Sequence, residues 1–224
     1  MINKILYSNL GFDPEQDFVP IGLFVTAPNL LMAYPALPAR NVTELIALAK
    51  NSPGKINFAS AGVGSINHLA GELFKRMAAI DIAHVPYRGA GPALNDLIGG
   101  HVQLFFGASA SSIAPGQIRV PGSSGPRRSA IMPDVPTIAE QGLAGFEASS
   151  WYALVAPAGT PDPIIATLTA EMANVLKSPD VLARIHQLGA EPGDQMSGAA
   201  FSAFMQSERK RWSDVIRASG AKAK

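Results

Sequence analysis

Residues 56–74 read INFASAGVGSINHLAGELF, and this stretch decides the fold class. The short apolar run 56–59 predicts a strand, and the glycines that follow it predict a loop over 60–64. From Ser65 onward the apolar residues recur at helical spacing, which predicts a helix with Ser65 as its N-cap. A strand, a loop and a helix in this order form half of a βαβ unit.

The same alternation continues along the rest of the chain. We expect further strands at 21–25, 29–34, 82–85, 102–106 and 151–155. Further helices are expected after Asn41, after the turn 86–91, after Thr160 and Ser178, and across 201–216. Short strands that alternate with helices are typical of a mostly parallel α/β sheet.

Local signals also mark the ends of elements and the irregular segments. Asn41 and Glu44 have the spacing of a capping box, so a helix should begin between them. Residues 1–20 hold few apolar residues in any period and are expected to be a connecting segment. Residues 115–129 are rich in Gly and Pro and are expected to be a loop.

The composition excludes several classes of protein. Of the 224 residues, 47% are hydrophobic and 16% are charged, which argues against a disordered chain. The net charge is +1, so we expect no nucleic-acid partner. The chain has no Cys, which excludes a disulfide framework, a thiolate zinc site and a cysteine nucleophile. No run approaches the roughly 18 apolar residues of a membrane span, and we expect no signal peptide in this chain.

The loop Ser60-Ala61-Gly62-Val63-Gly64-Ser65 is the strongest candidate binding feature. Glycines between a strand and a helix let the backbone approach a ligand, and the N–H groups of a helix start attract an anion. No Lys follows the last glycine as in a P-loop, and Asn67 stands where a dinucleotide-binding loop has its third glycine. The alternative is a tight turn that only connects the strand to the helix.

His68 follows this loop and has three interpretations. It could donate a hydrogen bond to a bound anion, form a metal-ligand pair with Glu72, or serve only as a structural histidine. Two ligands do not make a metal site, and the spacing of the other histidines offers no third. We therefore predict no metal and no cofactor.

The turn 86–91, PYRGAG, precedes another helix and could face the same ligand. Tyr87 would supply a ring or a hydroxyl, and the backbone at Gly89 and Ala90 would supply N–H groups. Arg88 is expected to be solvated.

Ser109 lies in the segment 107–111, GASAS, which resembles the G-x-S-x-G nucleophile elbow of hydrolases. The final glycine of that motif is absent. The segment is better interpreted as a loop of small residues at the carboxyl end of a strand, where α/β sheets bind ligands.

Several motifs together carry a resemblance to a known family. They are SAGVGS at 60–65, HLAGELF at 68–74, HVPYRG at 84–89, DVPT at 134–137 and APAGTP at 156–161. In this order they resemble the Bug family, the solute-binding receptors of tripartite tricarboxylate transporters. The resemblance implies a periplasmic-binding-protein fold of type II, in which two α/β domains surround a cleft for a small carboxylate. It also implies a periplasmic, non-enzymatic protein whose partners are the membrane subunits of the transporter.

The resemblance suggests an assignment of domains and of ligand contacts. Residues 22–145 would form domain two, and 1–21 with 146–224 would form the remainder of domain one. The first domain would then be incomplete at its N-terminus, which would favour oligomerisation through that domain. The expected ligand-binding residues are Ser60, Gly62, Val63, Gly64, Ser65, His68, Tyr87, Gly89, Ala90 and Ser109.

Two alternatives remain open at this point. One is a serine hydrolase that uses Ser109, and the other is a truncated receptor that folds but no longer binds. Gly107 and Ala108 offer no side-chain acceptor for an ammonium group. We therefore expect a preference for carboxylates that carry no amine.

Overall fold

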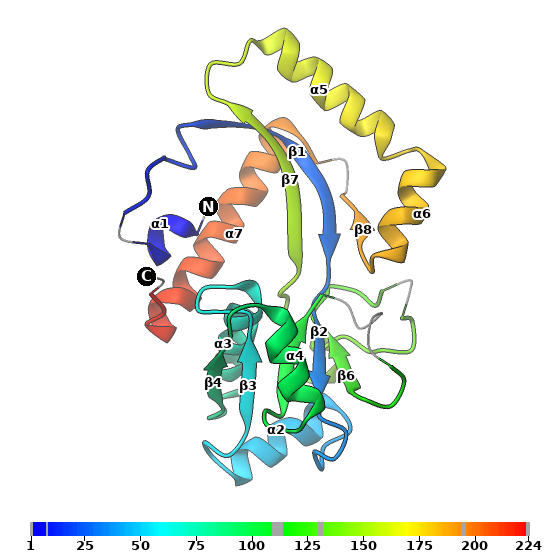
Figure 1. The fold of residues 1–224 in the computed structure, drawn as a ribbon. Coiled ribbons are helices and arrows are strands. Elements are labelled where there is room, and N and C mark those ends of the chain that lie inside the picture. The colour runs from blue at the N-terminus through cyan, green and yellow to red at the C-terminus, as the bar shows by residue number, and fades with distance from the viewer. Residues whose placement is uncertain (1, 8, 109–113, 130–131, 194–195, 223–224) are drawn as a thin grey trace. The chain divides into compact units, whose positions relative to one another are not determined.

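A computed structural model of the chain describes residues 2–7, 9–108, 114–129, 132–193 and 196–222 (Figure 1). The contacts within the chain divide it into two units. One unit is Pro28–Ser150, and the other combines Met1–Ala27 with Trp151–Lys224. The sequence suggested that this unit would span residues 22–145. In the structure both of its boundaries lie a few residues later in the chain.

The unit Pro28–Ser150 is built on a five-stranded sheet in the order β4-β3-β5-β2-β6. The strands are β2 (Leu30–Ala33), β3 (Asn57–Ser60), β4 (Ala83–Pro86), β5 (Leu104–Gly107) and β6 (Arg119–Ser123). β3 pairs in parallel with β4 and β5, whereas β2 is antiparallel to both β5 and β6. The sheet is therefore mixed: β4, β3, β5 and β6 run in one direction, as expected for a mostly parallel sheet, and β2 runs against them. A short apolar run that is buried on both faces, such as Leu30–Ala33, does not indicate whether its strand pairs in parallel or antiparallel.

Two helices cover the two faces of this sheet (Figure 1). α4 (Ala90–Ile98) packs Ala93 and Leu97 against Met32, Ala59 and Phe105 on one face. α3 (Ile66–Ala78) lies on the other face, where Phe74 contacts Phe106 with ring centroids 5.9 Å apart. Successive strand residues point to opposite faces, so β3 places Ala59 under α4 and Phe58 under α3.

The helix starts predicted from local signals are confirmed. α2 (Val42–Asn51) begins at Asn41, whose side chain accepts the N–H of Glu44 at 2.8 Å. The carboxylate of Glu44 reaches one residue further back than a standard capping box and accepts the N–H of Arg40 at 2.7 Å. Ser65 caps α3 through the N–H of His68.

The segment 115–129 is not wholly a loop, because β6 runs through it. β6 is the outermost strand of the sheet, and its register with β2 shifts between Leu31 and Ala33. Leu31 pairs with Gly122 and Ala33 pairs with Arg119, so Met32 faces two residues, one of which is Pro121. A bulge on an edge strand is a position where the missing N–H of proline is tolerated.

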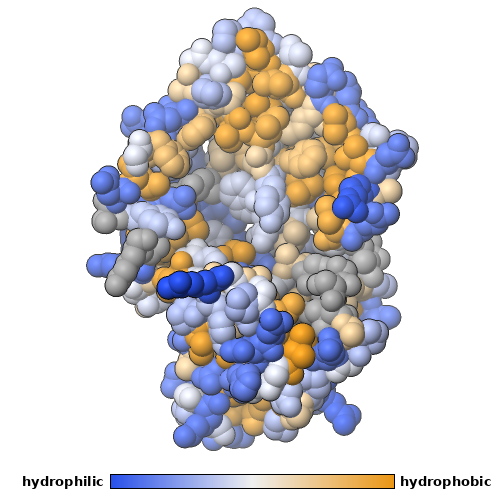
Figure 2. All heavy atoms as spheres, in the orientation of Figure 1, coloured by the Kyte–Doolittle hydropathy of each residue, from blue (hydrophilic) through white to orange (hydrophobic). Residues whose placement is uncertain are grey.

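The second unit has a small sheet in the order β7-β1-β8, made of β1 (Phe18–Ala27), β7 (Ser150–Pro157) and β8 (Glu191–Pro192). Its helices are α1 (Asn3–Leu6), α5 (Asp162–Val175), α6 (Pro179–Gln187) and α7 (Gly198–Ser219). Residues 1–20 thus hold a short helix and the start of β1 as well as a connection. A buried core that includes Ile21, Met172 and Ile185 joins β1 to α5 and α6. Apolar side chains that include Ile164 and Leu168 are exposed on α5 (Figure 2).

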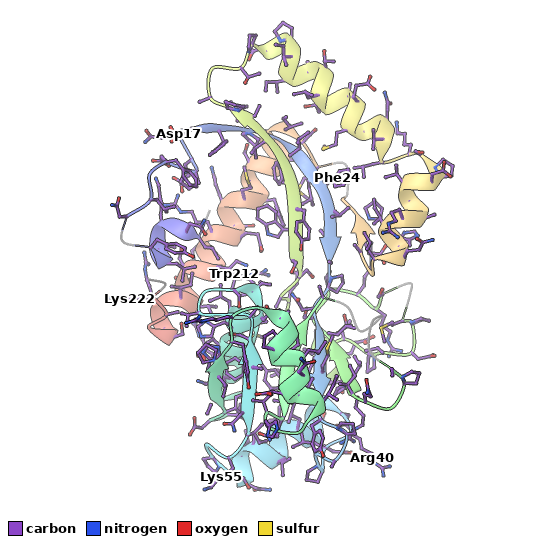
Figure 3. All side chains as sticks on the ribbon, viewed as in Figure 1. Asp17, Phe24, Arg40, Lys55, Trp212 and Lys222 are labelled. Atoms are coloured by element: carbon purple, nitrogen blue, oxygen red, sulfur yellow. The ribbon has the colours of Figure 1, made fainter. Side chains whose placement is uncertain are left out.

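Two tryptophans of this unit share one buried carboxylate. The indole N–H groups of Trp151 on β7 and Trp212 on α7 both donate to Oε2 of Glu208, each at 3.1 Å. Trp212 is labelled in Figure 3. Arg211 lies 2.7 Å from Oε1 of the same side chain. In the part of the chain that the structure describes, no helix is both long enough and apolar enough to cross a membrane.

Candidate functional site

The candidate site lies where the chain changes direction within the larger sheet. From β3 the chain passes through α3 to β4 on one side, and from β4 it passes through α4 to β5 on the other side of β3. The carboxyl ends of β3, β4 and β5 therefore lie at one edge, with α3 and α4 beginning there from opposite faces. Ligands of open α/β sheets bind outside the carboxyl ends of the strands at such a switch point.

The glycine-rich loop 60–65 is held by hydrogen bonds within itself and to His68. The N–H of Gly62 donates to Oγ of Ser60 at 3.1 Å, and the N–H of Gly64 donates to Nδ1 of His68 at 3.2 Å. The hydroxyl of Ser65 donates to the carbonyl of Gly62 at 2.7 Å. Gly62 and Gly64 have φ values of 136° and 81°, which residues with a Cβ adopt at a cost. The glycines thus serve the shape of the loop.

The second turn is attached to the first. The N–H of Tyr87 donates to the carbonyl of Ser60 at 3.0 Å, and the N–H of Gly89 donates to the carbonyl of Ala61 at 3.1 Å. The hydroxyl of Tyr87 donates to Oδ2 of Asp96 on α4 at 2.6 Å. Burial and this bond raise the pKa of Tyr87 to about 12, so its hydroxyl stays protonated near neutral pH.

Several N–H groups at this edge remain available to a ligand. Among the described residues, the structure gives no acceptor for the N–H groups of Val63, Ile66, Ala90 and Gly91. Ile66 and Ala90 are the first residues of α3 and α4, where the helix dipole adds partial positive charge. The two turns together can donate to an anion from two helix starts.

Two histidines lie beneath the glycine-rich loop. His68 is buried, with a relative exposure of 5%, and its ring stacks on that of His84 at a centroid distance of 3.9 Å. The ring of His84 also stacks on Phe58 at 4.9 Å, and its Nε2 lies 2.7 Å from Oγ of Ser60. Burial lowers the pKa of both histidines to about 4, so both are neutral near pH 7.

The structure brings most of the predicted ligand residues to this edge, but with different roles. The side chains of Ser60, Ser65 and His68 bond within the loop, whereas Val63 and Ala90 are exposed. Ser109, the remaining predicted contact, lies outside the described residues. The described residues contain no group of three or more His, Asp or Glu that could hold a metal ion.

Sequence reasoning missed His84. It was placed in strand 82–85 and in the motif HVPYRG, but without a role at the loop, and the parallel register places it beside Phe58. That register is not visible in the sequence, so spacing along the chain could not associate His84 with the loop.

Comparison with known proteins identifies the family. The model of the tripartite tricarboxylate transporter family receptor matches residues 2–221. The chain belongs to this receptor family. A Bordetella pertussis member, protein BugT, is 36% identical over 226 residues, which cover 98% of this chain and 68% of BugT. The resemblance to the Bug receptors is confirmed.

Solved structures of receptor proteins share the fold. An R. palustris protein solved with adipate has a TM-score of 0.82 and 34% identity over 97% of this chain and 73% of its own. MatC from Rhodopseudomonas palustris, solved with malate, has a TM-score of 0.80 and 32% identity over 96% of this chain and 75% of its own. The α/β fold of a periplasmic binding protein is confirmed, and no finding supports the hydrolase alternative.

The chain is shorter than several of its curated relatives. It spans between 64% and 68% of the lengths of three of them. The receptor family is a family of periplasmic binding proteins.

Proposed function

We propose that this chain captures a small carboxylate for a tripartite tricarboxylate transporter. Its location would be the periplasm, its partners would be the membrane subunits of that transporter, and it would catalyse no reaction. Support comes from its family and from the adipate and malate in the solved relatives.

The observation that carries the proposal is the pair of attached turns at the edge of the sheet. Each turn leads into a helix start, and N–H groups of Val63, Ile66, Ala90 and Gly91 have no acceptor among the described residues. A carboxylate supplies two oxygen atoms, each of which accepts more than one hydrogen bond, and its charge favours the helix starts. The predicted contacts at Gly62, Gly64, Tyr87 and Gly89 are proposed to shape this surface.

A thermal-shift screen tests the proposal with adipate and malate, together with mono- and tricarboxylates. An acid at 100 times its dissociation constant should stabilise the protein by about 2.7 kcal/mol. Gly64→Val should abolish the shift, because a β-branched residue disfavours φ of 81° and would move the loop.

Gly142→Val is the matched control. Gly142 also has a positive φ, 106°, but lies after the short helix Ala139–Gln141, with no atom within 4 Å of an added Cβ. This variant should be strained to a similar degree and should still respond to the acid. An equal shift in the Gly64→Val protein, or no shift with any acid, would refute the proposed function.

A further inference from the structure

His68 and His84 form hydrogen bonds with the glycine-rich loop. Nδ1 of His68 accepts the N–H of Gly64 directly. Nε2 of His84 contacts Oγ of Ser60, and that hydroxyl in turn accepts the N–H of Gly62 at 3.1 Å. One imidazole therefore supports each of the two glycines whose positive φ values shape the loop.

The hydrogen bonds assign the same tautomer to both rings. Nδ1 of His68 accepts a bond, so its proton must lie on Nε2, which faces Oε1 of Glu72 at 3.9 Å. The hydroxyl of Ser60 donates to the carbonyl of Gly62 at 3.1 Å. A hydroxyl has one proton, so Nε2 of His84 must be the donor in its contact with Ser60.

The surroundings of the pair favour neutral rings. On α3 the ring of His68 is buried, and the positive charge of Lys75 opposes its protonation. The carboxylate of Glu72 faces the ring at 3.9 Å, but it also contacts Nζ of Lys75 at 3.2 Å. On β3 the neighbours are Phe58 and Ser60, which carry no charge. Two stacked imidazoles 3.9 Å apart cannot both become cationic without strong repulsion, and the low pKa values of about 4 agree with this.

From this geometry we infer that His68 and His84 are positioning residues of the carboxylate-binding loop and act as neutral imidazoles. The inference rests on the proposed function for its effect on affinity. Protonation of Nδ1 in His68 removes the acceptor for the N–H of Gly64 and places a donor against a donor. Ligand affinity should therefore fall as the pH is lowered toward the pKa of the pair.

The first experiment needs no ligand. Two-dimensional ¹⁵N NMR of the wild-type protein at pH 7 should give an acceptor-type shift for Nδ1 and a protonated-type shift for Nε2 in both rings. The amide signal of Gly64 should move in His68→Phe, which keeps a stacking ring without an acceptor. It should stay near its wild-type position in His68→Asn, whose Oδ1 lies close to the place of Nδ1. A protonated Nδ1 in either ring, or an unmoved Gly64 signal in His68→Phe, would overturn the inference.

The second experiment measures binding of malate and adipate by calorimetry between pH 7 and pH 4, because the rings protonate only near their pKa of about 4. Loss of one supporting hydrogen bond should weaken binding about tenfold in His68→Phe and in His84→Phe. His68→Asn keeps a hydrogen-bond acceptor, and His84→Gln keeps an N–H donor at Nε2. Both variants should therefore bind the acids nearly as tightly as the wild-type protein. Equal weakening in both kinds of variant would mean that only ring packing matters, which contradicts the inference.

His101→Gln is the control for the loss of a histidine. His101 is exposed and precedes β5, so it lies at the opposite edge of the sheet. Its replacement should change neither the affinity nor the pH profile. If the wild-type protein binds neither acid, the proposed function fails, while the NMR experiment still decides whether the two histidines hold the loop.

Discussion

The ring of Phe58 occupies the space that a side chain at residue 71 would fill. A Cβ added to Gly71 on α3 would lie 2.1 Å from Cε2 of Phe58 on β3. The helix approaches the strand closely at this point, and the same phenyl ring stacks on the ring of His84 at a centroid distance of 4.9 Å. Helix packing and loop support therefore depend on the same aromatic residue.

Gly71→Ala should destabilise the protein. Overpacking against a buried ring costs about 1 to 3 kcal/mol, more than the roughly 1 kcal/mol that alanine gains over glycine in a helix. Urea denaturation followed by circular dichroism measures the difference. Gly91→Ala is the matched control on α4, since nothing lies within 4 Å of its added Cβ. A Gly71→Ala protein as stable as the Gly91→Ala protein would contradict the packing argument.

The two buried histidines should make stability depend on pH. Their pKa values are lowered from 6.5 to about 4 in the folded protein, so between these values the unfolded chain binds more protons. The stabilising contribution is complete above about pH 6.5 and is lost as the pH falls toward 4. We expect the free energy of unfolding to decrease by about 2 kcal/mol for each histidine between pH 7 and pH 5.

Denaturant unfolding at several pH values measures this slope. His68→Asn and His84→Gln should each flatten it, whereas His101→Gln should leave it unchanged. A wild-type slope that neither replacement alters would show that other groups cause the pH dependence.

The local parts of the fold could be predicted from the sequence. The glycine-rich loop and its Ser65 cap depend on residues within five positions of each other, so periodicity and capping signals were sufficient. β6 could not be predicted, because its Pro and Gly residues are turn signals and only pairing with the distant strand β2 makes it a strand. The direction of β2 was missed for the same reason.

The location of the candidate site could be predicted from the sequence, but its hydrogen bonds could not. The glycines indicated the loop, but the sequence could not reveal that the N–H groups of Gly62 and Gly64 bond inward. The acceptors are the side chains of Ser60 and His68, and the Ser60 hydroxyl is in turn contacted by His84, which reaches the loop through the register of Phe58 with His84 between β3 and β4. Long-range pairing therefore supplies the contact that holds the Ser60 hydroxyl, which the sequence could not reveal.

The buried carboxylate of Glu208 should be essential to the smaller unit. Glu208→Leu leaves the indole N–H groups of Trp151 and Trp212 without their acceptor, which should cost about 3 kcal/mol. Tryptophan fluorescence during urea denaturation reports this directly, because both partners are the fluorophores. Asp214→Asn on the same helix is the control, since its ion pair with Lys210 is exposed and 3.6 Å long. Equal stability of the two variants would contradict the role of Glu208.

The proposed site should prefer a dicarboxylate without an amine. An ammonium group needs an acceptor in a desolvated site, but Gly107 and Ala108 have no polar side chain. The carboxylate of Asp96 already accepts the hydroxyl of Tyr87 at 2.6 Å, and that of Glu72 lies 3.2 Å from Nζ of Lys75.

Succinate and aspartate isolate this effect, because they are diacids of equal length that differ only by the amine. Calorimetric titration should give at least about tenfold tighter binding of succinate, which corresponds to about 1.4 kcal/mol. Asp96→Asn keeps an acceptor for Tyr87 but removes the carboxylate charge. If Asp96 does not bind the ammonium group, the ratio of succinate affinity to aspartate affinity should change only by a small factor in this variant. If aspartate binds as tightly as succinate, an acceptor for the ammonium group exists and the predicted preference is wrong.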